Sequence, residues 1–191
     1  MNVSSKITQK LAALFILTMA VTLSNEFADG GFVRAQSGAS AAKTSQGENA
    51  VKMSAQVGQP APDFSLVDAL GKPVSLAKLK GKIVVLEWFN HGCPFVKKHY
   101  DGGNMQSLQK TYTGKGVVWL SICSSAAGKQ GFATGEEHLK VMADKKASPS
   151  HILIDADGKV GHLYGAKTTP HMYVIDKSGK LVYAGAIDDK R

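Results

Sequence analysis

The stretch from Ile83 to Tyr100 constrains the fold of this chain more than any other. It starts as an apolar run, continues through Glu87-Trp88-Phe89, and breaks at Asn90-His91-Gly92 before Cys93-Pro94. After Pro94 the pattern becomes helical and basic. This order predicts a buried strand over 83–89, then a tight loop, then a helix whose first turn holds a cysteine.

A cysteine in the first turn of a helix is a candidate thiolate. The unpaired N–H groups and the positive end of the helix dipole can lower a cysteine pKa from about 8.5 to between about 3.5 and 7.5. Pro94 suits a first-turn position, where no backbone donor is needed. The alternative is a buried structural cysteine, but this placement favours chemistry and makes Cys93 the candidate nucleophile.

The rest of the chain supplies further strands and helices in alternation. A helical region interrupted at 101–104 leads to a second apolar run, 117–122, which ends at Cys123. A helix between two such runs predicts two parallel, adjacent strands. Before these runs, two prolines predict an extended entry over 57–66. After them come a helix from Thr134 to about Lys146, a strand at 151–154, a short helix at 159–164 and a hairpin over 172–184. Thr134 and Glu137 have the spacing of a capping box at the start of the first of these helices.

The first 35 residues have the pattern of a secretory signal. An apolar stretch from Leu11 to Leu23 is too short to span a bilayer comfortably. Small residues predict cleavage before Gln36, and cleavage after Gly30 is the second option. We therefore expect a signal peptide at 1–35, a flexible linker at 36–56, a domain at 57–191, and a periplasmic or secreted protein. Contact with a membrane is expected only if the signal stays uncleaved.

Composition narrows the function classes. The net charge is +8, but the lysines are scattered and not interleaved with aromatic residues, so no nucleic-acid partner is predicted. Two cysteines are too few for a disulfide scaffold, and no Cys-x-x-Cys pair is present to hold zinc. No cofactor and no resident metal are predicted.

The order of strands and helices, with Thr169-Pro170 before the hairpin, resembles the thioredoxin superfamily. The opening Val57–Leu66 stretch and the turn at Asp155–Val160 are similar to its redoxin branch, which includes peroxiredoxins and exported thiol–disulfide oxidoreductases. The resemblance covers about 57–187. It implies an α/β three-layer sandwich, a central mixed sheet flanked by helices, with an N-terminal extension. The helix that ends thioredoxin folds is expected to be missing.

The resemblance also implies roles for individual residues. Cys93 matches the nucleophile, Glu87 matches the buried acid below the active site, and Pro170 matches the cis-proline that faces the cysteine. Asn90, His91 and Pro94 form the supporting loop.

Two departures from the family pattern limit which of the family's residue roles apply to this chain. Val96 stands where the second cysteine of a Cys-x-x-Cys pair would be. Peroxiredoxins need a Thr or Ser where this chain has Asn90, and an arginine that holds the peroxide. No arginine lies between Arg34 and Arg191.

Three functions are compatible with these residues. The first is thiol–disulfide exchange on protein or small-molecule disulfides, with Glu87 relaying a proton; the alternative for Glu87 is a carboxylate paired with a neighbouring lysine. An external thiol reductant or Cys123, at the same edge of the sheet, would resolve the product. The second is reduction of a hydroperoxide substrate through a sulfenic acid. The third is a copper-handling module built from Cys93, His91 and His171-Met172.

Two expectations concern residues outside these roles. Cys123 has a simpler alternative as a small buried filler. His99 is expected at the surface or as a helix cap.

Overall fold

The apolar run that begins at Ile83 forms the centre of a seven-stranded mixed sheet. The computed structural model describes residues 6–19 and 54–188. Strand β3 (Val84–Trp88) pairs in parallel with β4 (Val118–Cys123) and antiparallel with β6 (His171–Ile175). The strand order is β2-β1-β5-β4-β3-β6-β7. The predicted pair of adjacent parallel strands joined by helix is confirmed.

The other elements follow the predicted order closely. The remaining strands are β1 (Ser65–Asp68), β2 (Pro73–Ser75), β5 (His151–Ile154) and β7 (Leu181–Gly185). The helices are α1 (Lys6–Met19), α2 (Pro94–Asp101), α3 (Asn104–Thr113), α4 (Gly135–Asp144), α5 (Lys159–Tyr164) and a 3-10 turn, η1 (Leu76–Leu79). The predicted capping box forms, because Thr134 and Glu137 satisfy each other's backbone N–H groups at the start of α4.

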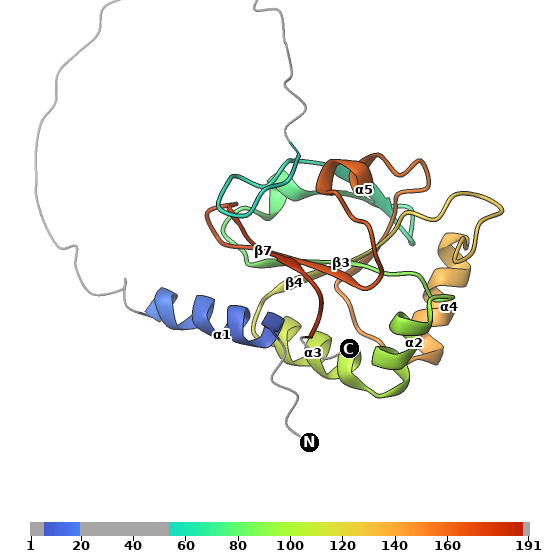
Figure 1. Cartoon of the computed structure of the whole chain (residues 1–191), viewed down its shortest axis with the longest axis horizontal. Helices are drawn as coiled ribbons and strands as arrows, with labels where there is room; N and C mark the ends of the chain where they lie inside the picture. Colours follow the sequence, from blue (N-terminus) through green and yellow to red (C-terminus); the bar gives the residue numbers. More distant parts are fainter. Residues whose placement is uncertain (1–5, 20–53, 189–191) are drawn as a thin grey trace, which may run out of the picture.

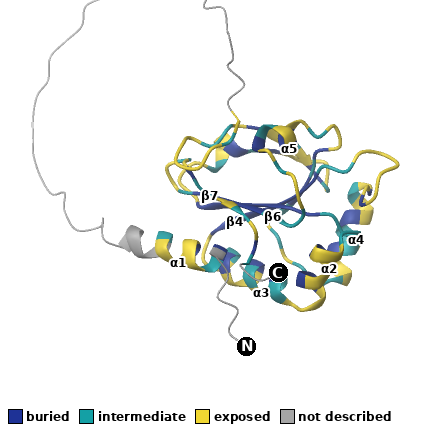
Figure 2. Ribbon diagram, in the orientation of Figure 1, coloured by how far each residue is buried: buried dark blue, intermediate teal, exposed yellow. Residues whose placement is uncertain are grey.

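Both faces of the sheet are covered, which explains why the central strands are apolar without alternation. Helices α1 to α4 lie on one face, and α5, η1 and the segment before β1 lie on the other (Figure 1). Val85 faces the first group of helices, whereas Leu86 and Trp88 face the second. Figure 2 shows the central strands as a continuous buried layer between the two groups. The α/β sandwich expected from the resemblance is confirmed.

Helix α1 belongs to the predicted signal segment and packs against the domain. Ile7 and Leu11 are fully buried, and the Tyr112 hydroxyl donates to the Thr8 carbonyl at 3.3 Å. The predicted cleavage sites and most of the predicted linker lie outside the described residues. Within 6–19 and 54–188, no helix combines the length and the apolarity needed to cross a membrane.

Two local expectations differ from the structure. The stretch after Phe64 was expected as an extended lead-in, but Ser65–Asp68 is a full strand because β2 and β5 supply partners on both sides. His99 was expected at the surface or as a helix cap, and it is buried, because its side chain contacts residues of neighbouring segments. Its Nδ1 lies 3.0 Å from the Asn104 amide, and its Nε2 lies 3.8 Å from Asp188.

Candidate functional site

Cys93 stands at the N-cap of α2, directly after the loop that follows β3. Strand β6 runs antiparallel to β3, with Trp88 opposite His171. Residues just before His171 must therefore lie beside residues just after Trp88. Accordingly, the half-buried Cys93 thiol donates to the Thr169 carbonyl at 3.3 Å, and the Thr169–Pro170 peptide is cis.

The surroundings of Cys93 lower its pKa. Burial acts to raise it, but hydrogen bonds from the Thr169 side chain and from the Val96 and Phe95 backbone N–H groups outweigh burial. The contact with the Thr169 carbonyl favours the protonated thiol, so the lowering of the Cys93 pKa comes from the Thr169 side chain and from the N–H donors at the helix start. No charge on Lys97 or Lys98 is among the causes, although both side chains are exposed close to the thiol.

Glu87 lies fully buried beneath α2 and is held by neutral donors. Its Oε1 accepts from the Tyr100 hydroxyl at 2.7 Å. Its Oε2 accepts from Trp119 Nε1 at 2.7 Å, from Ser121 Oγ at 2.9 Å and from Gln109 Nε2 at 3.2 Å. Burial raises the pKa of Glu87, and these four hydrogen bonds offset part of the rise.

This network corrects the expected surroundings of Glu87. A neighbouring lysine was the alternative explanation for a buried carboxylate, and no described lysine pairs with Glu87. Within residues 6–19 and 54–188, no hydrogen bond joins Glu87 directly to Cys93 either; the network instead ties β3 to α2 through Tyr100 and to α3 through Gln109. The Tyr100 pKa is raised well above its ordinary value by burial and by the adjacent carboxyl.

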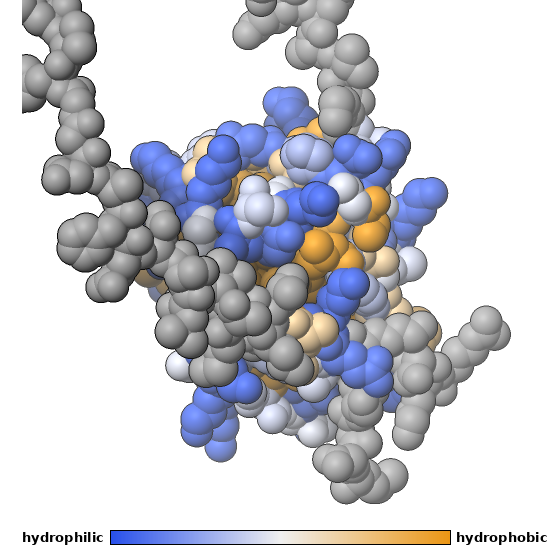
Figure 3. Space-filling model, turned by 90° about the vertical axis from the view of Figure 1, so that its left-hand side faces the viewer, coloured by the Kyte–Doolittle hydropathy of each residue, from blue (hydrophilic) through white to orange (hydrophobic). Residues whose placement is uncertain are grey.

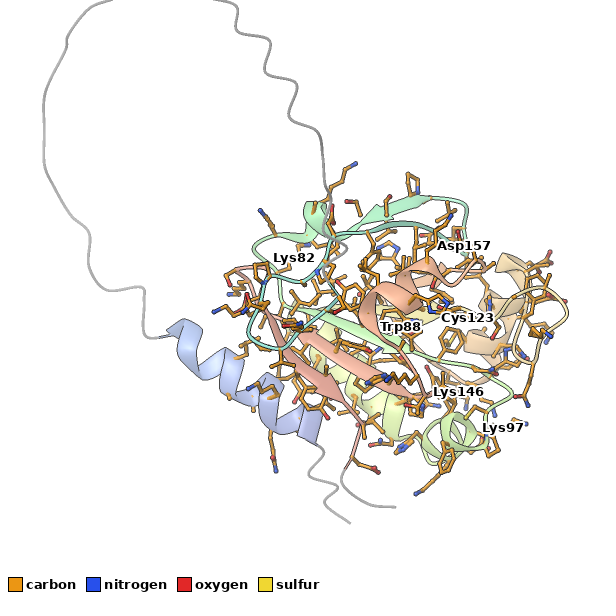
Figure 4. The ribbon with its side chains drawn as sticks, turned by 45° about the horizontal axis from the view of Figure 1, so that its top comes forward. Lys82, Trp88, Lys97, Cys123, Lys146 and Asp157 are labelled. Atoms are coloured by element: carbon orange, nitrogen blue, oxygen red, sulfur yellow. The ribbon has the colours of Figure 1, made fainter. Side chains whose placement is uncertain are left out.

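Cys123 ends β4 at the same edge of the sheet and has a different environment. It is 2% exposed, and its thiol donates to the Gly131 carbonyl at 3.4 Å. Both Cys123 and Cys93 are free thiols. Trp88 and Cys123 lie at one end of the sheet in Figure 4, with Lys97 on α2 at the outer surface.

A reciprocal clasp joins the Cys93 loop to the loop that covers Cys123. Asn90 Nδ2 donates to the Gln130 carbonyl at 2.9 Å, and Gln130 Nε2 donates to the Gly92 carbonyl at 3.3 Å. Asn90 Oδ1 also accepts from the Gly92 N–H at 2.8 Å. Gly131 has φ +81 and packs so tightly on Asn90 that a Cβ there would lie 2.2 Å from Oδ1. Sequence reasoning missed Gln130, since no local pattern marks it.

An open pocket of about 230 Å³ is lined in part by Thr169, the residue whose carbonyl contacts the Cys93 sulfur. Its floor includes Trp88, whose indole N–H donates to Ser124 Oγ at 3.0 Å. Ser124 donates in turn to the buried Asp155 at 2.5 Å, and Asp155 also accepts from the backbone N–H groups of Val160 and Gly161. The Asp155 turn that carried the resemblance thus supports the pocket next to the cysteine.

The histidines expected to converge on a metal do not do so. His171 Nδ1 lies 3.1 Å from the Tyr173 hydroxyl, and Met172 is fully buried in the core. His91 instead faces His138, with ring centroids 6.1 Å apart, and neither Nδ1 has a hydrogen-bond partner among the described residues. In the described part of the chain, no three His, Cys, Asp or Glu side chains are grouped closely enough to hold a metal.

The other end of the sheet offers space without a reactive group. A pocket of about 470 Å³ there is lined by residues that include Leu76, Lys80 and Ile175. Figure 3 views this end and shows hydrophilic side chains around a central hydrophobic patch. The thiol, the lowered pKa and the neighbouring pocket together place the candidate site at the Cys93 end.

Comparisons with known proteins agree with this arrangement. A protein-family model described as the AhpC/TSA family matches residues 57–184. The thiol-disulfide oxidoreductase ResA of Bacillus thuringiensis is 32% identical over 137 residues, covering 72% of this chain and 73% of that protein. The thioredoxin-like protein YneN of Bacillus subtilis is 31% identical over 137 residues, covering 71% and 75%.

A solved structure supports the same fold. An uncharacterized conserved protein from Geobacillus kaustophilus superposes with a TM-score of 0.64 at 31% identity, covering 71% of each chain. The fold is thus thioredoxin-like, as the order of strands and helices predicted.

Proposed function

Because this chain belongs to the AhpC/TSA family, we propose that it is an exported thiol–disulfide oxidoreductase that works through a single cysteine, Cys93. The observation that carries the proposal is the half-buried Cys93 sulfur, whose pKa is lowered by donors at the start of α2. The thiolate is the attacking species in disulfide exchange, so a lowered pKa makes it available near neutral pH. The similarity to thiol-disulfide oxidoreductases supports the same reaction class.

The exchange step needs only Cys93 from this chain. The Cys93 thiolate attacks one sulfur of a substrate disulfide, the substrate S–S bond breaks, and a mixed disulfide forms on Cys93. The released thiolate takes a proton from solvent. A second thiol must then attack the mixed disulfide, and Val96, at the position of a neighbouring cysteine, cannot supply it.

We assign the second step to an external thiol rather than to Cys123. Cys123 is 2% exposed and bonded to the Gly131 carbonyl, beneath a loop clasped to Asn90 and Gly92. For Cys123 to react, that loop would have to open. An internal disulfide would also require Cα atoms within about 7 Å.

Glu87 and Pro170 support this site in different ways. The contacts of Glu87 favour a positioning role, since Tyr100 links it to the helix whose first turn holds Cys93. A direct proton relay has no hydrogen bond to run through. Pro170 follows Thr169, so its cis peptide places the Thr169 carbonyl against the Cys93 sulfur.

Export rests on the N-terminal segment. Basic residues followed by a short apolar stretch fit a secretory signal, and disulfide exchange suits an oxidising compartment. A periplasmic or secreted location follows from these two features. Sequencing the N-terminus of the protein isolated from its native cells tests this, since an intact Met1 would contradict cleavage.

The decisive test of function uses matched cysteine variants. The reduced protein is mixed with 2-hydroxyethyl disulfide and the reaction is quenched with acid. The mass of the intact protein is then measured by mass spectrometry. We expect a mixed disulfide on wild type and Cys123→Ser at rates within about twofold, and none on Cys93→Ser. Adduct formation on Cys93→Ser would contradict the proposal. A two-hydrogen mass loss that requires Cys123 would replace the external thiol with an internal one.

Peroxide reduction is measured in the same experiment. The chain lacks an arginine between Arg34 and Arg191 to hold a peroxide, so we expect hydrogen peroxide to oxidise Cys93 slowly. Oxidation by equimolar peroxide that is faster than mixed-disulfide formation would favour a peroxidase instead.

A further inference from the structure

The pocket beside Cys93 has the chemistry of a small-molecule subsite. Its volume of about 230 Å³ is below the usual range of about 300–1,000 Å³ for a whole ligand, so it has room for one part of a small molecule. Trp88 and Phe89 give it an apolar floor, and hydroxyl groups of Ser125, Thr168 and Thr169 line its sides. Thr169 also contacts the Cys93 sulfur, so a molecule in this pocket lies next to the nucleophile.

The only charged side chain that lines this pocket is a cation. Lys167 is exposed and has no ion pair among the described residues. Among the residues that line the pocket, Ser124 donates a hydrogen bond to a carboxylate, that of Asp155. That carboxylate is 1% exposed and accepts from Ser124, Val160 and Gly161. Asp155 is thus satisfied behind the floor, and Lys167 is free to pair with a ligand.

The wider rim of the site has the same charge. The three segments that meet at Cys93 are 88–98, 124–133 and 165–171, and none contains an aspartate or glutamate. They carry four lysines: Lys97, Lys98, Lys129 and Lys167. The whole chain has 15 acidic residues, so these three segments are distinguished by their net positive charge; Glu137, outside them, interacts electrostatically with His91. A cleft lined by one sign of charge concentrates ligands of the opposite sign.

We propose that this pocket binds the carboxylate-bearing part of a small disulfide or thiol, of the peptide-like class represented by glutathione. This inference rests on the proposed function and names the substrate class for the same site. Lys167 pairs with a carboxylate of the ligand, and the Thr168 and Ser125 hydroxyls donate to it. The ligand sulfur then lies at the Thr169 edge, within reach of Cys93.

The occupant serves both half-reactions. In the first, the Cys93 thiolate attacks one sulfur of the bound disulfide, forming a Cys93 mixed disulfide and releasing one ligand thiolate. In the second, the thiolate of a different small thiol attacks the ligand sulfur of that mixed disulfide. The Cys93–ligand S–S bond breaks, a disulfide of the ligand with the second thiol leaves, and Cys93 is again a thiolate. The bound disulfide is the oxidant and the second thiol is the reductant.

The test compares three disulfides of different charge on the reduced full chain. Glutathione disulfide is anionic, 2-hydroxyethyl disulfide is neutral and cystamine is cationic. The rate of Cys93 adduct formation is measured by acid quench and mass spectrometry for wild type, Lys167→Glu and Lys177→Glu. Lys177, in the turn between β6 and β7, is an exposed lysine that gives the same charge change without lining the pocket.

We expect Lys167→Glu to slow the reaction with glutathione disulfide about tenfold, and to speed the reaction with cystamine. The neutral disulfide should react within about twofold of wild type, and Lys177→Glu should change all three rates by less than about twofold. Equal effects of the two substitutions, or no effect of Lys167→Glu, would overturn the pocket assignment alone. Failure of wild type to react with the neutral disulfide would overturn the proposed function, and this inference with it.

Discussion

Cys93 follows the loop after β3 and Cys123 ends the neighbouring parallel strand β4, so both lie at the same end of the sheet, yet their environments differ. Cys93 is half-buried at the start of α2, and donors there lower its pKa. Cys123 is 2% exposed and bonded only to the Gly131 carbonyl beneath a clasped loop. The comparison shows that the helix N-terminus and access to solvent, rather than the position at the end of a strand, separate the candidate nucleophile from a buried thiol.

The largest expected effect comes from giving Cys93 a neighbouring thiol. Val96 lies in the first turn of α2, and its N–H bonds the Cys93 sulfur. Val96→Cys should therefore form an internal disulfide after exchange and shorten the lifetime of the mixed disulfide by about a hundredfold or more. Mass spectrometry should show a two-hydrogen loss, whereas Val96→Ala should keep the mixed disulfide. A persistent mixed disulfide in Val96→Cys would contradict the geometry.

Removing the Glu87 carboxylate should cost the most stability. Glu87→Leu leaves the Trp119, Ser121, Gln109 and Tyr100 donors unpaired in the core, at a cost of about 3 kcal/mol or more. Glu87→Gln retains an oxygen for three donors and an amide for the Tyr100 hydroxyl, and should cost about 1 kcal/mol or less. Urea unfolding measures both. Equal stability of the two variants would contradict the claim that the hydrogen bonds to residue 87 stabilise the fold.

The pH dependence of Glu87 has a definite sign. Burial raises its folded-state pKa above the ordinary 4.5, so its contribution to stability is fully present below that value. It is lost as pH rises through the raised pKa. Wild type should therefore lose stability relative to Glu87→Gln as pH rises from about 4.5. A difference between the two proteins that stays constant with pH would show that Glu87 does not titrate as proposed.

A smaller effect is expected at Thr169. Thr169→Val removes the side-chain hydrogen bond that lowers the Cys93 pKa, so this pKa should rise and alkylation near pH 7 should slow by about threefold. Thr168→Val is the matched control, because Thr168 lines the pocket without contributing to the Cys93 pKa. Iodoacetamide rates against pH give the result. Similar profiles for the two variants would show that the Thr169 side chain does not lower the Cys93 pKa.

The smallest effect concerns the clasp. Gln130→Ala removes the hydrogen bond to the Gly92 carbonyl, worth about 1 kcal/mol. Opening of the loop over Cys123 should become about fivefold more frequent, and native-state labelling of Cys123 should rise accordingly. Gln56→Ala, outside the site, provides the baseline. No change in Cys123 labelling would mean that the clasp does not control access.

The elements of this fold were readable from the sequence because their signals are local. Apolar runs marked β3 and β4, the capping box marked α4, and the interruption at 101–104 separated α2 from α3. β1 was missed since its pairing depends on distant strands.

The site was readable only in part. Cys93 carried a local signal, the N-terminus of a helix. Three other features depend on contacts between segments distant in the chain: the bonding of Glu87 to Trp119, the clasp of Asn90 with Gln130, and the pairing of His91 with His138. Nothing local distinguishes His138 or Gln130 from ordinary helix and loop residues.

The contrast between the two cysteines is tested most directly by labelling both in one native protein. Iodoacetamide labelling across pH, followed by peptide mass spectrometry, gives a separate rate for Cys93 and Cys123. We predict that Cys93 reacts about a hundredfold faster at neutral pH, with its pKa lowered by the donors around it from the ordinary cysteine value of about 8.5. Equal rates at the two positions, or a Cys93 pKa that is not lowered, would contradict the contrast between the two thiols.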